Sequence, residues 1–306
     1  MTALDPTETA LRLPYDALVR ELVSLLADGS VQVPPRLVQR LEGGGSLFVM
    51  PATDSTFAIV KTITFVPSNA GTGRLVIQGE VTVFDVVTGE RRMILDGPTV
   101  TARRTAAVSL LAAQRLAPNL RGPLLVAGAG AQGRAHLEAF VEVLGVTEVR
   151  VASRTRASAQ KLVDDAHAMG VDARVVTDVD AQLAECPLVV TCTPANRVVL
   201  RAMPRPDAFI AAIGAFTPAM MELDAAVSRH IADQGTVVVD TVDARQEAGD
   251  LLQAGLDVSN LADLRAVVLG ALQKRAGPVL FKSCGWAGWD LAAARTAMLD
   301  PGSSQR

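Results

Sequence analysis

A glycine-rich turn between an apolar run and an amphipathic run is the feature that most constrains how this chain can fold. Residues 124–127 are apolar, and the next six read Gly128-Ala129-Gly130-Ala131-Gln132-Gly133. Apolar residues then recur at the spacing of one helix face, at Leu137, Phe140, Val141 and Leu144. The segment therefore predicts a strand, a tight turn and a helix in direct succession.

Each glycine in this G-x-G-x-x-G spacing has a physical task. Gly128 permits the tight turn, Gly130 lets the backbone approach a pyrophosphate, and Gly133 allows the helix to pack closely on the strand. The N–H groups and the dipole at the helix start favour the negative charge of a phosphate. An ordinary glycine-rich turn can show the same sequence motif. A further strand at 148–151 follows close behind, however, and favours a dinucleotide site. We assign to it Gly128, Gly130, Ala131, Gln132 and Gly133.

The end of this second strand bears on the choice of cofactor. Sites that prefer NAD(H) usually carry Asp or Glu here, about 20 residues after the glycines, to hold the ribose 2′-hydroxyl. This chain has Ser153, Arg154 and Thr155 there, followed by Arg156. A hydroxyl and two guanidinium groups suit a 2′-phosphate, although arginine is also common in solvated loops. The sequence favours NADP(H), with NAD(H) as the alternative, and places Ser153, Arg154 and Thr155 in the cofactor site.

The composition excludes several classes of protein. Of 306 residues, 49% are hydrophobic and 20% charged, with a formal net charge of −3. This length suffices for two domains and large cores. The charge, and the lack of a basic stripe with interleaved aromatic residues, argue against a nucleic-acid partner.

Cysteine and histidine form no metal-binding pattern. Cys186, Cys192 and Cys284 make no C-x-x-C pair, and the three histidines are scattered, so we expect no metal site. So few cysteines fit a reducing compartment. The N-terminal region has no apolar core of signal length, and no unbroken apolar run approaches about 18 residues. We therefore expect a cytoplasmic protein without a membrane partner.

The predicted secondary structure changes along the chain. Residues 46–95 are rich in Val, Ile, Thr and Phe, in runs typical of strands. From 124 onward, apolar strands alternate with helices, which predicts a parallel sheet covered on both faces. One such strand ends at Thr193-Pro194, where a cofactor loop belongs at the carboxyl edge of the sheet. We expect an α/β protein with a Rossmann dinucleotide-binding domain.

Three cations stand in unusual places. Arg36 follows two prolines, Lys61 lies within an apolar strand pattern, and Arg104 lies in the first turns of a helix rich in small residues. A buried lysine or arginine is costly unless it meets an anion. Each could also be an ordinary surface charge, and the pattern alone leaves both interpretations open.

Taken together, these residues resemble the ornithine cyclodeaminase/mu-crystallin family over nearly the whole chain. No single match is decisive, but their order and spacing are specific. The matches are Pro35-Arg36; Met50-Pro51; Lys61 with Phe65, Pro67 and Asn69; Thr88-Gly89; Asp96-Gly97; Thr101 with Arg104 to Ala107; Gly128 to Gln132; Gly214-Ala215 with Pro218 and Glu222 to Asp224; Glu247 with Gly249-Asp250; and Phe281 to Ser283 with Gly285 and Asp290.

The resemblance implies a homodimer built from two domains. An α+β substrate-binding and dimerisation domain would comprise 1–118 with 279–306, and the Rossmann NAD(P)-binding domain would comprise 119–278. It implies that Arg36, Lys61 and Arg104 hold the carboxylate of an amino or imino acid. By the same resemblance Thr105, Thr193 and Ser283 would contact the cofactor, together with Arg104, and Glu247 would be an acidic group at the substrate pocket.

One departure from the family pattern bears on the reaction. Members that deaminate ornithine carry Asp in the motif G-A-D-x-P-G-K, whereas this chain has Phe216 at that position and Met220 in place of the lysine. A phenyl ring can neither pair with an amine nor transfer a proton. Phe216 would instead form an apolar substrate wall.

The sequence thus predicts an NADPH-dependent reductase of a small cyclic ketimine carboxylate. The expected substrate is Δ1-pyrroline-2-carboxylate or Δ1-piperideine-2-carboxylate, which would give proline or pipecolate. Lys61 or Glu247 would supply or stabilise the proton on the imine nitrogen. The alternatives are an ornithine cyclodeaminase, an amino-acid dehydrogenase, and a non-catalytic ligand-binding protein like mu-crystallin.

Overall fold

The chain divides into two compact units in a computed structural model, which describes residues 2–194 and 196–299. Unit 1 comprises residues 1–105 with 286–306, and unit 2 comprises residues 106–285. Helix α3, Gly97–Leu116, is continuous across the division at 105. The mixed α/β fold class predicted from the sequence is confirmed.

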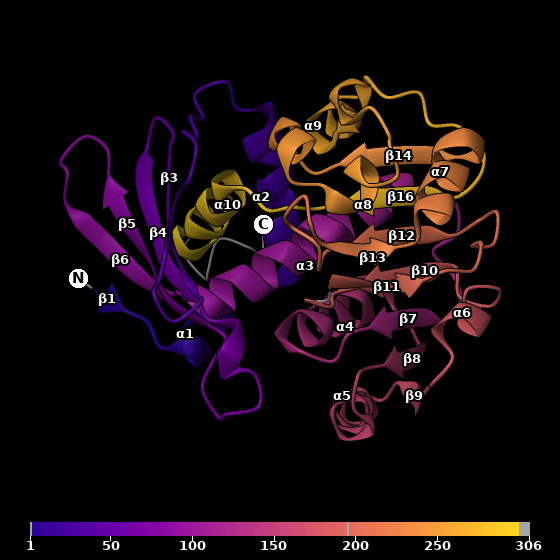
Figure 1. Ribbon diagram of the computed structural model, residues 1–306. Helices are drawn as coiled ribbons and strands as arrows, with labels where there is room; N and C mark the ends of the chain where they lie inside the picture. The colour runs from indigo at the N-terminus through magenta and orange to yellow at the C-terminus, as the bar shows by residue number, and fades with distance from the viewer. Residues whose placement is uncertain (1, 195, 300–306) are drawn as a thin grey trace. The chain divides into compact units, whose positions relative to one another are not determined.

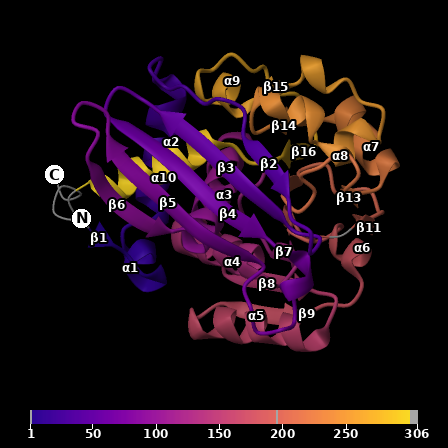
Figure 2. The same ribbon diagram turned by 60° about the vertical axis from the view of Figure 1, so that its left-hand side comes forward.

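Unit 1 is built on a six-stranded sheet with the order β1-β6-β5-β4-β3-β2 (Figure 2). The strands are β1 Thr2–Ala3, β2 Leu37–Arg40, β3 Ser46–Thr53, β4 Phe57–Phe65, β5 Ile77–Asp85 and β6 Arg91–Asp96. Strand β1 runs parallel to β6, and all other neighbours are antiparallel. The long strands alternate between buried and less buried positions, as expected for a sheet with one face on a core.

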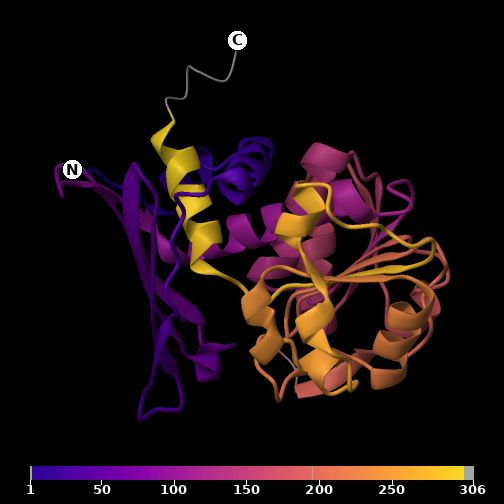
Figure 3. The ribbon, with the colours of Figure 1, turned by 90° about the horizontal axis from the view of Figure 1, so that it is seen from above.

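Unit 1 also contains several helical segments. They are α1 Pro6–Leu11, α2 Tyr15–Ala27, the 3₁₀ turn η1 Pro67–Asn69 and α10 Ala287–Met298. Helix α10 contacts β3, β4 and β5 as well as α2, and Figure 3 shows it, in yellow, between the purple strands and the indigo helix. It is buried over nearly its whole length, because its many alanines leave room for neighbours on every side.

Unit 2 is a parallel eight-stranded sheet with the order β15-β14-β16-β12-β10-β7-β8-β9 (Figure 1). The strands are β7 Leu124–Ala127, β8 Glu148–Ala152, β9 Asp172–Val175, β10 Leu188–Thr191, β12 Phe209–Ala212, β14 Thr236–Val239, β15 Ala262–Asp263 and β16 Val279–Lys282. A separate parallel pair joins β11 Asn196–Leu200 to β13 Met221–Leu223. The central strands are buried at every position and are apolar except at Thr191 and Lys282, as expected for strands covered on both faces.

The helical segments of unit 2 connect these strands, and they account for the alternation predicted from the sequence. They are α4 Ala131–Leu144, α5 Arg156–Ala168, α6 Val179–Gln182, α7 Ala225–Gln234, η2 Val242–Gln246, α8 Gly249–Leu252, η3 Val258–Asn260 and α9 Leu264–Val268.

The strand order of unit 2 reverses between β7 and β10. From β7 the chain moves outward through β8 to β9, then returns to the other side of β7 with β10 and continues to β12. Ligands of open parallel sheets bind at such a switch point, beyond the carboxyl ends of the strands. The glycine turn follows β7 and Thr193 follows β10, so both lie at this edge.

The unit boundary differs from the predicted domain boundary at the C-terminal side. Residues 279–282 form β16, which pairs with β12 on one side and β14 on the other. They therefore belong to the parallel sheet and not to the α+β unit, and the chain leaves unit 2 only after Gly285. An apolar run indicates a buried strand, but its place in the sheet depends on pairing partners that are distant in the sequence.

Candidate active site

The glycine turn of unit 2 has the geometry that the motif predicts. Gly128 has φ +121°, and a Cβ there would lie 2.7 Å from the carbonyl oxygen of Cys192. A Cβ on Gly133 would lie 1.9 Å from the carbonyl oxygen of Gly128, so α4 rests directly on the turn. A Cβ on Gly130 would meet nothing within 4 Å, which leaves the backbone approachable from outside.

The start of α4 suits a phosphate. Gly130 is its N-cap and provides no side chain to satisfy the first N–H groups of the helix. A helix of this length presents those N–H groups and the positive end of its dipole to an anion. The residues present therefore fit a dinucleotide, whose nicotinamide would supply hydride chemistry.

The end of β8 places the predicted cofactor-selecting residues beside this turn. The N–H of Gly128 donates to the carbonyl of Ala152, 2.8 Å away, which ties the glycine turn to the strand end. Ser153 is half-buried and Arg154 is exposed, and Arg156 begins α5. Thr155 is the N-cap of α5, where its Oγ1 accepts from the N–H of Ser158 at 3.2 Å. This cap gives Thr155 a local role, while its assignment to the cofactor site stays a prediction.

The loops after β10 and β12 are held by one buried carboxylate. Glu222 accepts from the N–H of Thr193 at 2.7 Å, from the Thr193 hydroxyl at 3.0 Å, and from the N–H of Gly214 at 2.6 Å. Burial raises its pKa, with the attraction of Lys282 opposing the rise. Glu222 thus fixes Thr193, a predicted cofactor contact, and exposed Pro194 follows directly.

A buried ion pair, Lys282 with Asp250, lies beside Glu222. Lys282 lies 3.0 Å from Asp250 and donates to the carbonyl of Ala212 at 3.1 Å. Asp250 also accepts from the N–H groups of Glu222 and Leu223, at 2.5 and 2.9 Å. Every charge in this group thus meets a partner from the same unit.

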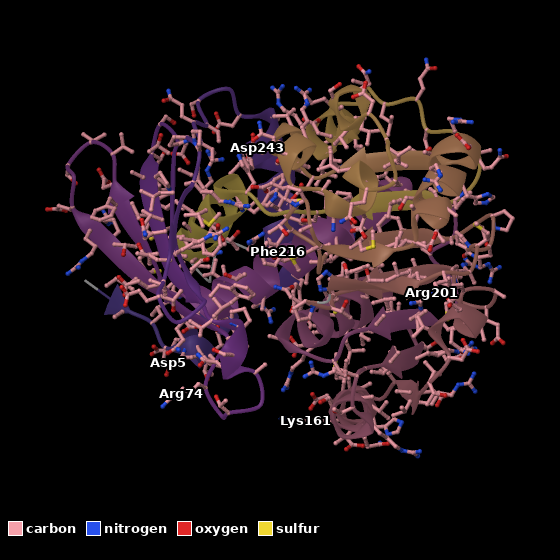
Figure 4. The ribbon with its side chains drawn as sticks, viewed as in Figure 1. Asp5, Arg74, Lys161, Arg201, Phe216 and Asp243 are labelled. Atoms are coloured by element: carbon pink, nitrogen blue, oxygen red, sulfur yellow. The ribbon has the colours of Figure 1, made fainter. Side chains whose placement is uncertain are left out.

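The remaining predicted residues of unit 2 lie on two loops. The Ser283 hydroxyl donates to Asp240, 2.8 Å away, and the same carboxylate oxygen accepts from the N–H groups of Cys284 and Gly285. Glu247 is half-buried at the end of η2, and its charge contributes to a raised pKa of Cys284, whose main cause is burial. Phe216, labelled in Figure 4, is half-buried in the loop after β12.

Unit 1 brings together two of the three predicted cations. Lys61 is 1% exposed and Arg104 is 6% exposed. The Nζ of Lys61 lies 2.9 Å from Oδ1 of Asp290, and the Nε of Arg104 lies 3.2 Å from the same oxygen. The sequence predicts that a buried Lys61 must meet an anion, and here the chain itself supplies that anion, from α10.

The electrostatic environment of Lys61 extends to the third cation. Burial lowers the pKa of Lys61 to about 8; Asp290 opposes this, while Arg104 and Arg36 add to it. Arg36 is half-buried, with its guanidinium carbon 5.8 Å from the centre of the Phe48 ring. Thr105 is buried one position after Arg104 on α3.

Four carboxylates at these sites were not assigned roles from the sequence: Glu222, Asp240, Asp250 and Asp290. Three of them lie in motifs that carry the family resemblance, so they were visible only as matches. A usable signal existed, because an acidic residue inside an apolar run is costly unless it pairs with a buried cation.

Among residues 2–194 and 196–299, no group of three or more His, Cys, Asp or Glu side chains could hold a metal ion. No helix in these ranges has the length and apolarity needed to cross a membrane.

Comparisons with known proteins match nearly the whole length of the chain. Residues 7–299 match the ornithine cyclodeaminase/mu-crystallin family. The chain is 39% identical, over 298 residues, to Delta(1)-pyrroline-2-carboxylate reductase 2 of Burkholderia ambifaria, covering 96% of this chain and 94% of that protein. It is also 39% identical, over 306 residues, to a Delta(1)-pyrroline-2-carboxylate/Delta(1)-piperideine-2-carboxylate reductase of Azospirillum brasilense, covering 97% of each.

A solved structure supports the fold. Delta(1)-pyrroline-2-carboxylate reductase of Thermococcus litoralis, in complex with NADH and L-proline, superposes with a TM-score of 0.89 at 23% identity. The match covers 97% of this chain and 96% of that one. At this identity the likeness shows a shared fold.

Proposed function

The chain belongs to the ornithine cyclodeaminase/mu-crystallin family, and from that premise we propose that it reduces a small cyclic ketimine carboxylate with NADPH. The substrate would be Δ1-pyrroline-2-carboxylate or Δ1-piperideine-2-carboxylate, and the product proline or pipecolate. The observation that carries the proposal is the buried group of Lys61 and Arg104, with Arg36 nearby, in a chain 39% identical to named reductases of these two imines.

The cation group would bind the substrate carboxylate. Arg104 and Arg36 both act on Lys61, and Asp290 lies against Lys61 and Arg104. The substrate carboxylate would be a further anion for these cations. Holding the carboxylate would orient the ring and its C=N bond. The half-buried ring of Phe216 would cover ring methylenes without leaving a polar atom unpaired.

Reduction of a C=N bond needs a proton as well as a hydride. A protonated imine is a far better hydride acceptor than a neutral one, so a group able to donate a proton near neutral pH is required. Lys61, with its pKa lowered to about 8, suits this role better than an ordinary lysine. Glu247 is the alternative donor.

We infer a preference for NADPH from the end of β8. Exposed Arg154 and Arg156, together with Ser153, would receive a 2′-phosphate, and no acidic side chain is present there to hold a 2′-hydroxyl. Steady-state kinetics with each cofactor would test this. If Arg154→Ala weakens the binding of NADPH and of NADH equally, Arg154 is not the contact of the 2′-phosphate.

The test of the function is a substrate screen that follows NADPH absorbance. The purified protein should oxidise NADPH with Δ1-pyrroline-2-carboxylate or Δ1-piperideine-2-carboxylate and leave ornithine untouched. Ornithine would bring a charged amine against Phe216, which offers no counter-charge. Ammonia released from ornithine, with no imine reduction, would restore the cyclodeaminase alternative.

We also propose that the enzyme is a homodimer, as the family resemblance implies. Light scattering after size-exclusion chromatography would test it, and a mass equal to one chain at all protein concentrations would contradict it.

A further inference from the structure

Asp290 is buried at the cation group but has no part in the function proposed above. It lies in α10 with its side chain 0% exposed. Its Oδ1 accepts from Nζ of Lys61 at 2.9 Å and from Nε of Arg104 at 3.2 Å. One oxygen thus fixes the position of two cations that come from different elements, β4 and α3.

The charges around Lys61 come from three sides. Asp290 faces it from α10, Arg104 from α3, and Arg36 from the segment before β2. Within the sheet, Lys61 lies between Met50 on β3 and Val81 on β5, which are both apolar and buried.

The other charged side chain of α10 does not join this group. Arg295 pairs with Glu21, Asp28 and Asp54. Among the described residues that act on Lys61, Asp290 is therefore the carboxylate that offsets the neighbouring cations.

Removing this carboxylate would change the protonation of Lys61. Burial, Arg104 and Arg36 all disfavour the charged form, and Asp290 opposes them. Lys61 would then be neutral over more of the neutral pH range, and a neutral amine can neither attract a carboxylate nor donate a proton to an imine.

We propose that Asp290 is a positioning residue of the reductase, which holds the Lys61 ammonium in place and keeps it charged until it protonates the imine. This rests on the proposed function. An N–H bond of Lys61 breaks as the new N–H bond forms on the substrate, and the imine carbon takes the hydride with its electron pair. The substrate is reduced, the nicotinamide is oxidised, and Lys61 regains its proton from water.

The first test compares pH profiles of kcat/KM for the native enzyme and Asp290→Asn. In the native enzyme kcat/KM should fall as the pH rises through about 8, where Lys61 loses its proton. An amide keeps the shape but loses the charge, so in the variant this fall should move down by about one pH unit or more. The loss should therefore be at least about fivefold larger at pH 8 than at pH 6.

A matched control separates this role from a structural one. Asp54 is also a buried carboxylate of unit 1 paired with α10, through Arg295, but it does not touch Lys61. Asp54→Asn should weaken the fold and leave the pH at which activity falls unchanged. An equal loss at every pH in Asp290→Asn would overturn the proposal.

The second test does not depend on activity. The chain has four lysines, so the ¹³Cε signal of each can be followed by NMR, and Lys61→Met identifies the signal of Lys61. Lys61 should titrate near pH 8 in the native protein and at lower pH in Asp290→Asn. An unchanged titration would refute the role of Asp290 while leaving the reductase function standing. A shifted titration in a protein that reduces no imine would refute the function alone.

Discussion

Two of the four lysines are fully buried, one in each unit, and they form similar pairs. Lys61 lies 2.9 Å from Asp290 in unit 1, and Lys282 lies 3.0 Å from Asp250 in unit 2. Distance and burial do not distinguish the pairs. What differs is the set of charges around each lysine.

Among the groups that act most strongly on Lys61, cations outnumber the carboxylate, whereas the carboxylates around Lys282 are balanced by that lysine and by backbone N–H groups. Arg104 and Arg36 lower the pKa of Lys61 further, after burial. Burial also opposes the charge on Lys282, but Asp250, Cys284 and Glu222 together outweigh it, so the pKa of Lys282 is raised. The carboxylates near Lys282 also accept N–H groups of the chain. A balanced buried group stabilises the fold, whereas an excess of one charge favours a ligand of the other.

The largest effect should come from the group with excess charge. Lys61→Met and Arg104→Met should each lower kcat/KM for a cyclic imine carboxylate by about a thousandfold or more, through lost carboxylate binding and, for Lys61, lost proton donation. Each variant leaves Asp290 one cationic partner, so the protein should stay folded. Near-native kcat/KM in either variant, with unchanged circular dichroism, would remove that residue from the site.

The balanced group should instead respond in stability. Lys282→Met leaves Asp250 and Glu222 as two buried carboxylates without their cation, which should cost about 3–5 kcal/mol of unfolding free energy. Urea denaturation followed by circular dichroism measures this. Lys274→Met is the control, since within the described residues Lys274 donates to the carbonyl of Leu116, and the substitution should cost about 1 kcal/mol. A Lys282→Met protein as stable as the control would break the comparison.

Local patterns in the sequence predicted most elements of the fold. The strand before the glycine turn is found at 124–127, where the sequence predicts it, because its run of buried apolar residues ends where the turn begins. Strand β16 was found as a run but grouped with the wrong unit, since pairing with β12 and β14 leaves no local signal.

The candidate site was predictable in its cations but not in its carboxylates. Lys61 stood out because its neighbours in the sequence are apolar. Its partner Asp290 is 229 positions away, and no periodicity links the two. The glycine turn was predictable for the opposite reason, since its function depends on consecutive residues.

Glu222 offers an intermediate test of the balanced group. Glu222→Gln keeps the shape of the side chain, but an amide nitrogen cannot accept the N–H groups that the carboxylate accepts from Thr193 and Gly214. A lost hydrogen bond to a charged group should cost about 2–3 kcal/mol of unfolding free energy. Measured stability equal to that of the native protein would mean that these loops do not depend on the carboxylate.

The smallest effect is a change of about 2 kcal/mol with pH in the unfolding free energy contributed by Lys61. The two lysines differ here because their pKa values are shifted in opposite directions. Lys61 has its pKa lowered to about 8 from the ordinary 10.5, so between these values the unfolded chain holds more protons than the folded one. The unfolding free energy contributed by Lys61 should therefore rise between about pH 7.5 and 9.5. Lys282, with its raised pKa, should keep its contribution over this range and lose it only at higher pH.

Comparison with Lys61→Met isolates the contribution that the titration of Lys61 makes to the unfolding free energy. The buried thiols Cys186, Cys192 and Cys284 have raised pKa values, mainly through burial, so they lower stability as the pH rises, equally in both proteins. From about pH 7.5 to 9.5 the native protein should thus gain about 2 kcal/mol relative to Lys61→Met in urea denaturation. A constant difference between the two proteins would mean that Lys61 titrates like an ordinary lysine.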